Sequence, residues 1–444
     1  MFNKPLFILA HQAQYPKFYS TYKNVVKNQW NSYETQKKQQ EKHLRYMIGF
    51  AYRNVPYYHK LFNDLKLSPN DINKIEDLEK LPILTKEIIR SNWEAFKPAN
   101  LSSMKYNKQA TGGSTGTPLK YRLLKEDRFL NAILLYRGWG YAGFELGDKM
   151  TFIAGASLDV GTKSIFNKKI HEVTRNIRKL SSFDMSEVDM KQYTEVLNSF
   201  NPKYIRGYPS SLYFYCKWIQ ENDISIKLPD AVSTTSEKLL PYMRETIRDV
   251  FNCEIFDAYG LNDGGVSAFE CKEHNGLHID TDRSIMEIVD SNGFQLDEGQ
   301  GDIIATSLHN FAMPLIRYHT GDMGHIIEDK CGCGRGSKLL KEVLGRSVDI
   351  LITPEGKSVH GWFFLYIMWQ YCHGVKEYQV IQKQVDLIVI KLVIDDQFDE
   401  KQLNNIKEIV REKSDSWVLK FEFVDKIERT KAGKLKFIIS ELNK

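Results

Sequence analysis

Long apolar runs are missing from this sequence. The longest, WFFLYIMW at 362–369, is far shorter than the roughly 20 residues that a membrane-spanning helix needs. The first residues, MFNKPLFILAHQAQ, contain a short apolar patch but no small-residue cleavage site, so no signal peptide is predicted. Both absences favour a cytoplasmic protein without a membrane span.

Cysteine and excess charge are also scarce. Six cysteines in 444 residues argue against a disulfide framework in a cytoplasmic chain and leave free thiols or metal ligands. The 61 basic residues nearly balance 56 acidic ones, and the densest basic run, KKQQEKHLR at 37–45, is interrupted by Gln and Glu. Nucleic acid is therefore not an expected partner, because it would need a clustered basic stripe.

The patterns that are present indicate several kinds of structure. A chain of this length favours two or three domains, and residues 1–105 have a mostly helical, polar pattern broken at NVPYY, 54–58. From about 150 to 345, short apolar runs (MTFIAG, YIRGY, AVSTTSE, EIFDAYG) alternate with helical ones. Such alternation predicts an α/β domain with a largely parallel sheet.

The last hundred residues have a different pattern. Two strand patterns at 377–394 precede a helical one, and two more strand patterns follow. In the helical pattern Leu403, Ile406, Ile409 and Val410 share a face. This predicts a small α+β domain, with its boundary near GRSVDI at 345–350. The predicted fold class is α/β: an N-terminal α/β domain, 1–345, with mixed sheets and a helical N-terminal region, and a small α+β domain, 346–444.

A loop rich in glycine and hydroxyl groups lies within KQATGGSTGTPLKYRLL, 108–124. Glycines let several N–H groups point at one anion, and Ser114, Thr115 and Thr117 add hydroxyl donors. This indicates triphosphate binding, although a plain flexible turn is the alternative for the loop alone. A P-loop is excluded, because no Gly-Lys-Ser/Thr follows and PLKYRLL has a strand pattern.

Five motifs in order resemble those of the adenylate-forming superfamily, which includes acyl-CoA synthetases, nonribosomal peptide adenylation domains and luciferases. They are the Gly-rich loop, YGLND at 259–263, YHTGD at 318–322, GRSVDI at 345–350 and ERTKAGKLKF at 428–437. Within the superfamily, RNVPYYHKLF, RGYPSSL and CGCGR resemble the phenylacetate–CoA ligase group, particularly the CapK-like proteins of polysaccharide gene clusters.

The resemblance implies a reaction in two steps. A small carboxylic acid would attack the α-phosphate of ATP, and the acyl group of the resulting adenylate would pass to the thiol of CoA. Both steps gather negative charge, which preorganised donors and cations stabilise. The small domain would be mobile and would rotate about Asp349 between the steps.

The resemblance also assigns roles to residues of this chain. Ser114, Thr115, Gly116 and Thr117 would hold the β- and γ-phosphates, with Thr115 counted among the catalytic residues. Lys434 would be the catalytic cation between the acid and the α-phosphate. The residues that would surround the adenosine and its α-phosphate side are Ser236, Glu237, Asp257, Ala258, Tyr259, Gly260, Asp322 and Arg346. Tyr259 would stack on adenine, and Asp322 would accept from both ribose hydroxyls.

Departures from the motifs keep other functions open. Gly112 replaces a frequent Ser, Val348 replaces the first Asp of the hinge pair, and Asp263 replaces the Glu expected to bind Mg²⁺. Aspartate can still bind Mg²⁺, so Asp263 is the predicted magnesium ligand. The alternatives are an amide ligase that passes the acyl group to an amino sugar, and a non-catalytic nucleotide-binding protein. The acceptor and the oligomeric state, a homodimer included, stay open.

The acid pocket is weakly specified. Tyr136, Tyr208 and Pro209 are its predicted residues, which would suit an aryl or other small acid, although aromatic residues in such patterns are more often core.

A metal site is predicted from Cys271, His278, Cys331 and Cys333, with His274 as an alternative to His278. Four thiolate and imidazole ligands fit a tetrahedral structural zinc; buried free thiols are the alternative.

Overall fold

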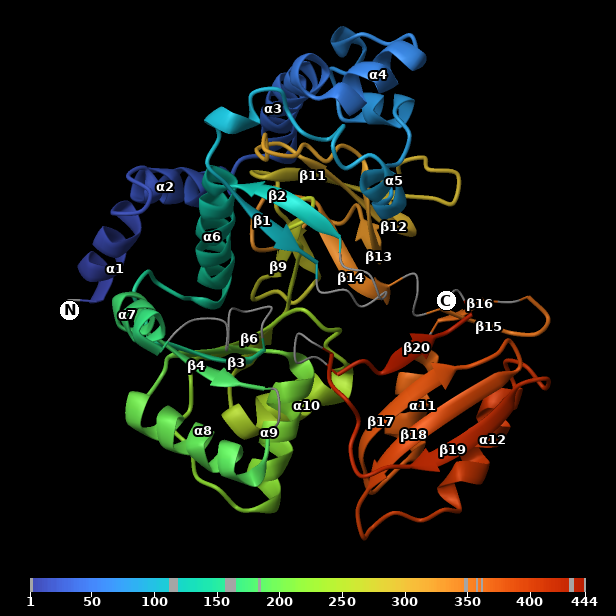
Figure 1. The fold of residues 1–444 in the computed structure, drawn as a ribbon. Helices are drawn as coiled ribbons and strands as arrows, with labels where there is room; N and C mark the ends of the chain where they lie inside the picture. The colour runs from blue at the N-terminus through green and yellow to red at the C-terminus, as the bar shows by residue number, and fades with distance from the viewer. Residues whose placement is uncertain are drawn as a thin grey trace. The chain divides into compact units, whose positions relative to one another are not determined.

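Two units make up the chain, Met1–Leu344 and Gly345–Lys444, and each is considered separately (Figure 1). The structure, a computed structural model, describes residues 3–111, 119–155, 165–182, 185–346, 350–356, 358–360, 362–430 and 435–442.

Helices dominate the first 105 residues, as predicted. They are α1 (Asn3–Gln12), α2 (Phe18–Asn28), α3 (Tyr33–Asn54), α4 (Pro56–Asp64) and α5 (Lys86–Ser91), with short 3-10 turns η1 (Pro69–Asp71), η2 (Glu76–Lys80) and η3 (Leu101–Ser103). Ser32 begins α3 by accepting a hydrogen bond from the Thr35 N–H. The break predicted at 54–58 is confirmed, because α3 ends at Asn54 and Pro56 opens α4.

A hairpin carries the Gly-rich loop. Strand β1 (Tyr106–Ala110) pairs antiparallel with β2 (Lys120–Leu124), and the loop joins them. The strand predicted after the loop is therefore confirmed. Helix α6 (Lys125–Trp139) follows at once and leads to η4 (Gly140–Ala142). A Cβ at Gly138 would lie 2.3 Å from the Phe269 ring, so α6 needs glycine there to approach the neighbouring strand.

Five parallel strands form the sheet expected from the alternating pattern. Their order is β4 (Ile177–Ser181), β3 (Met150–Ala154), β5 (Tyr204–Gly207), β6 (Ala231–Thr234) and β7 (Glu254–Phe256). The connecting helices are α7 (Ile165–Arg175), α8 (Glu187–Phe200), α9 (Pro209–Glu221) and α10 (Pro241–Phe251). Figure 1 shows α8, α9 and α10 on one side of this sheet and α6 on the other. Helices on both faces explain why most residues of these strands are buried.

The alternation predicted up to residue 345 is wrong beyond Phe256. A seven-stranded sheet follows there, and its described strand pairs are antiparallel. Its strands, in sheet order, are β11 (Ser284–Val289), β12 (Gly299–Ser307), β13 (Tyr318–Ile327), β14 (Leu339–Arg346), β10 (Leu277–Ile279), β9 (Ser267–Glu270) and β8 (Ala258–Gly260). Antiparallel neighbours need only short turns, whereas parallel neighbours need a crossover, so no helix separates these strands.

The second unit has the predicted α+β fold. A four-stranded sheet has the order β19 (Val418–Phe423), β18 (Leu387–Ile394), β17 (Val375–Gln382) and β20 (Ile438–Ser440). The unit also contains the pair β15 (Ile350–Ile352) and β16 (Ser358–His360), with helices α11 (Trp362–Tyr371) and α12 (Gln402–Arg411). Of the four residues predicted for one face of α12, Leu403, Ile406 and Val410 are buried and Ile409 is half-buried. Within the described ranges, no helix is both long and apolar enough to cross a bilayer.

Candidate nucleotide site and metal centre

Several predicted site residues lie outside the described part of the chain. These are Ser114, Thr115, Gly116 and Thr117 of the Gly-rich loop, the hinge residue Asp349 and the catalytic candidate Lys434. Arg346 ends β14, and only its backbone is described. Their roles stay predictions.

Two of the predicted adenosine residues contact each other directly. Tyr259 lies on β8 and Asp322 on β13, and the Tyr259 hydroxyl donates to Asp322 Oδ2 at 2.9 Å. Burial and the neighbouring Asp322 carboxylate raise the pKa of Tyr259 well above its ordinary value. The Asp322 N–H donates to Thr320 Oγ1 at 3.1 Å. The phenol is therefore neutral and acts as a donor that fixes the Asp322 carboxylate.

A second tyrosine–aspartate pair lies beside the first. Tyr318, the first residue of β13, donates its hydroxyl to Asp263 Oδ2 at 2.8 Å. Burial raises the pKa of Asp263; the Tyr318 hydrogen bond opposes that rise, and the nearby Asp322 carboxylate adds to it. Two buried carboxylates that repel each other favour a cation between or beside them. Asp263 thus fits the charge of a magnesium ligand.

The polar residues at the ends of β6 and β7 stabilise the backbone around the site. Glu237 Oε2 accepts from the N–H of Ser210, at the N-terminus of α9, at 3.1 Å. Asp257 Oδ1 accepts from Thr234 Oγ1 at 2.7 Å. Ser236 has a φ of +72°, a left-handed conformation that few non-glycine residues adopt. Such strain is common at binding sites.

The packing of the protein around position 260 leaves room for a side chain larger than that of glycine. A Cβ built there would meet no atom closer than 3.5 Å, which is ordinary contact with Ser267. The backbone at this position therefore does not need glycine for its own packing. The close approach of adenine at Gly260 stays a prediction.

Lys86 was missed by sequence reasoning. At the start of α5, its Nζ donates to the Thr320 carbonyl at 3.3 Å and lies 3.6 Å from the Cβ position of Gly321. It also stabilises the ionised form of Asp263. Backbone hydrogen bonds of Leu84 to Arg317 and His319 bring this segment to β13. The local sequence, LTKEII, contains no motif that could have identified it.

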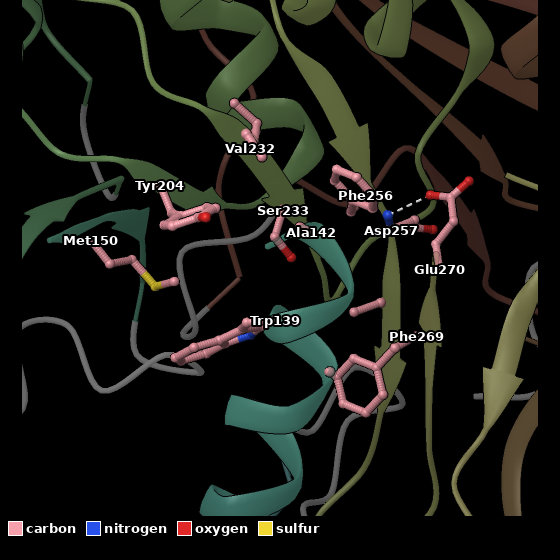
Figure 2. Close-up of a pocket in the computed structure, with 13 residues that line it drawn as sticks. Trp139, Ala142, Met150, Tyr204, Val232, Ser233, Phe256, Asp257, Phe269 and Glu270 are labelled. Atoms are coloured by element: carbon pink, nitrogen blue, oxygen red, sulfur yellow. Dashed lines mark hydrogen bonds between the residues drawn. The ribbon is translucent and has the colours of Figure 1, made fainter. Parts of the chain in front are cut away.

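A small cavity lies between α6 and the parallel sheet. It has room for about one water molecule. Trp139 lies across it from Tyr204 and Ser233 (Figure 2), and Asp257 and Ala258 line its end nearest the nucleotide motif. The full lining is Gly138, Trp139, Ala142, Met150, Tyr204, Ala231, Val232, Ser233, Phe256, Asp257, Ala258, Phe269 and Glu270.

The predicted acid-pocket residues do not line this cavity. Tyr136 packs among Phe7, Phe18 and Trp139, and its hydroxyl is 2.9 Å from His11 Nε2. Tyr208 is fully buried, directly before α9. Tyr136 is thus part of a core cluster, the alternative that its aromatic pattern had left open.

Cys271, His278, Cys331 and Cys333 come together as predicted. Their ligand atoms all lie within 4.8 Å of one another, with Cys271 Sγ 3.5 Å from Cys331 Sγ and Cys333 Sγ 3.3 Å from His278 Nε2. A tetrahedral zinc with Zn–S bonds of about 2.3 Å holds its sulfurs about 3.8 Å apart, so the cluster has the size of a zinc site.

The structure also distinguishes the two histidines. His274 Nδ1 lies 3.0 Å from Glu270 Oε1, outside the cluster. His278 turns Nε2 toward the cysteines, and its Nδ1 is 3.2 Å from Ser337 Oγ. A hydrogen bond to the second ring nitrogen is the usual way of orienting a metal-binding imidazole.

The chain matches one family model and several known proteins. Residues 351–441 match the model of the CapK C-terminal domain. Protein CapK of Staphylococcus aureus is 25% identical over 422 residues, covering 91% of this chain and 89% of CapK. A phenylacetate–coenzyme A ligase of Thermus thermophilus is 25% identical, covering 78% of each chain.

The fold is also that of solved ligases. The crystal structure of a 2-hydroxyisobutyryl-CoA ligase in its postadenylation state matches with a TM-score of 0.74, covering 94% of this chain and 91% of that one, at 15% identity. Likeness at this identity establishes the fold alone. Over most of its length the chain is similar to CapK and to phenylacetate–coenzyme A ligases, and it has the fold of the solved 2-hydroxyisobutyryl-CoA ligase.

Proposed function

We propose that this protein is an ATP-dependent acid–CoA ligase that forms an acyl adenylate and then an acyl thioester. The observation that carries the proposal is the pairing of Tyr259 with Asp322 beside Asp263 and Tyr318. These residues come from two of the five ordered motifs and lie on or next to strands of one sheet. Homology to phenylacetate–coenzyme A ligases across most of the chain supports the same activity.

In the first half-reaction, which forms the acyl adenylate, each of the site residues has a defined role. A carboxylate oxygen of the acid attacks the α-phosphorus, the bond to the β-phosphate oxygen breaks, and pyrophosphate leaves. Asp322, fixed by the Tyr259 hydroxyl, accepts hydrogen bonds from the ribose hydroxyls. Ser114, Thr115 and Thr117 hold the departing phosphates, and Lys434 stabilises the charge that develops at the α-phosphate.

The second half-reaction passes the acyl group to CoA. The thiol loses its proton, its sulfur attacks the acyl carbon, and AMP leaves. Rotation of the small domain about Asp349 would replace Lys434 with a path for the thiol.

Magnesium would bind at Asp263, whose buried carboxylate lies near that of Asp322. Mg²⁺ bound there would neutralise charge on the phosphates during transfer.

The activity can be tested by measuring pyrophosphate release from Mg-ATP with a panel of carboxylic acids, with and without CoA. We expect release that depends on the acid and a thioester product that depends on CoA. Acid-dependent release indifferent to CoA would indicate another acceptor, such as an amino sugar of polysaccharide biosynthesis. ATP binding without release for any acid would contradict the proposal and favour a non-catalytic nucleotide-binding protein.

We also propose that the four-residue cluster binds a structural zinc. The protein should contain about one zinc per chain when purified without chelator, as measured by inductively coupled plasma mass spectrometry. Cys331→Ser should lose the metal, because a tetrahedral structural site needs all four ligands. His274→Asn is the matched control and should keep the metal, because His274 contacts Glu270 instead. Full zinc occupancy in Cys331→Ser would contradict the site.

A cytoplasmic location is part of the proposal. All six cysteines are unbridged, including Cys271 and Cys331, whose sulfurs are 3.5 Å apart. Unbridged cysteines fit a reducing compartment.

A further inference from the structure

Arg206, on the central strand β5, is a buried cation with two guanidinium nitrogens that lack an acceptor among the described residues. Arg206 is 4% exposed. In the described part of the chain, no group accepts a hydrogen bond from its Nε or Nη1. The guanidinium lies 5.0 Å from the centre of the Trp139 ring. Burial lowers the pKa of Arg206 to about 10, which still leaves it charged at neutral pH.

Three other arginines buried to a similar degree have carboxylate partners, whereas Arg122, also 4% exposed, has no partner at Nη1 among the described residues and lies over the Trp93 ring. Arg137 contacts Asp280 and Asp282, Arg283 contacts Asp127, and Arg317 contacts Glu287. A buried charge without a partner is costly, so Arg206, like Arg122, calls for an explanation. Asp257 attracts it at longer range, but Asp257 Oδ1 accepts from Thr234.

The position of Arg206 connects it to the cavity beside the nucleotide motif. Residues two apart on a strand share a face, so Arg206 lies on the same face as Tyr204, which lines the cavity. Strand pairing places Arg206 beside Ser233, and Trp139 and Ser233 also line the cavity (Figure 2). Arg206 is one residue before the end of β5, and ligands of parallel sheets bind at such ends.

A second buried cation extends the positive character of this face. Pairing between β4, β3 and β5 puts Lys179, Phe152 and Arg206 in one row. Lys179 Nζ lies 5.7 Å from the centre of the Phe152 ring, and its residue is 9% exposed. Both cations therefore lie on the face of the sheet that also carries Tyr204.

We propose that Arg206 binds a second carboxylate on the acid substrate, so that the enzyme activates dicarboxylic acids. This inference rests on the proposed function. One carboxylate of the substrate would reach the α-phosphate, and the other would accept from the unpartnered N–H groups of Arg206. Arginine suits this task because its planar fork matches a carboxylate.

The test compares matched acids, namely succinate with butyrate, glutarate with valerate, and 1,4-phenylenediacetate with phenylacetate. Pyrophosphate release by the full chain gives kcat/KM for each acid. We expect kcat/KM for the dicarboxylate of at least one pair to exceed that for its matched monocarboxylate about 10–100-fold. This ratio corresponds to the free energy of a hydrogen bond between charged groups. Arg206→Met should abolish that preference and leave ATP affinity unchanged, and Arg206→Lys should keep part of it.

Thermal unfolding separates this inference from the proposed function. A dicarboxylate that binds should raise the melting temperature of the wild type but not of Arg206→Met, whether or not pyrophosphate is released. If a dicarboxylate raised the melting temperature but no acid caused pyrophosphate release, the ligase activity would be contradicted. The binding of a carboxylate by Arg206 would still be supported. An unchanged preference in Arg206→Met, or no preference in the wild type, would overturn the inference. A melting temperature several degrees lower in ligand-free Arg206→Met would also overturn it, because the side chain would then have a structural partner.

Discussion

Replacing Lys434 with alanine should slow acid-dependent pyrophosphate release about 10²–10³-fold, the usual cost of removing one donor from developing negative charge. The α-phosphate gains charge as the carboxylate attacks, and an ammonium held there stabilises the transition state more than bound ATP. The loss should therefore appear in kcat, with little change in the affinity for ATP. Steady-state pyrophosphate assays with saturating acid measure this directly.

The neighbouring lysines provide the matched controls. Lys431→Ala and Lys436→Ala remove the same charge from the same segment and should slow release only a few-fold, because the spacing Arg-Thr-x-x-Gly-Lys selects Lys434. Thioester formation from supplied acyl adenylate and CoA should be nearly unaffected in Lys434→Ala. Equal losses in all three variants would mean that the segment acts only as a basic surface.

The fold could be predicted where local patterns determine it. Strongly periodic segments such as α12 and the apolar strands β3 and β5 were identified with the right type. The antiparallel sheet beyond Phe256 was missed, because its short strands carry the same apolar signal as parallel ones. Only the connections distinguish the two, and connection length is weak information when strand ends are uncertain.

The residues of the candidate site could likewise be predicted only in part. Spacing brought Cys271, Cys331 and Cys333 into one prediction but could not choose between His274 and His278, which lie four residues apart. Their burial and partners make that choice, since His274 contacts Glu270. Arg206 could not be found from sequence at all, because an arginine in a strand carries no sign of whether a carboxylate faces it.

Removing either partner of the Arg283–Asp127 pair should destabilise the protein by about 3–5 kcal/mol, because each change leaves an uncompensated buried charge. Arg283 Nε and Nη2 donate to the two Asp127 oxygens at 3.0 and 2.8 Å, and both side chains are at most 3% exposed. Arg283 Nη1 also donates to Asn131. Urea unfolding of Arg283→Met and of Asp127→Leu measures each loss.

The double variant shows why the single losses are large. Arg283→Met combined with Asp127→Leu should recover most of the lost free energy, because two apolar side chains of similar volume leave no charge in the core. Glu187→Gln, which removes an exposed pair with Lys191 on α8, should be indistinguishable from wild type. If the double variant were as unstable as the sum of the single ones, the loss would come from packing and not from charge. The pair joins the start of α6 to the segment before β11, so a packing origin would mean that shape alone holds α6 against the antiparallel sheet.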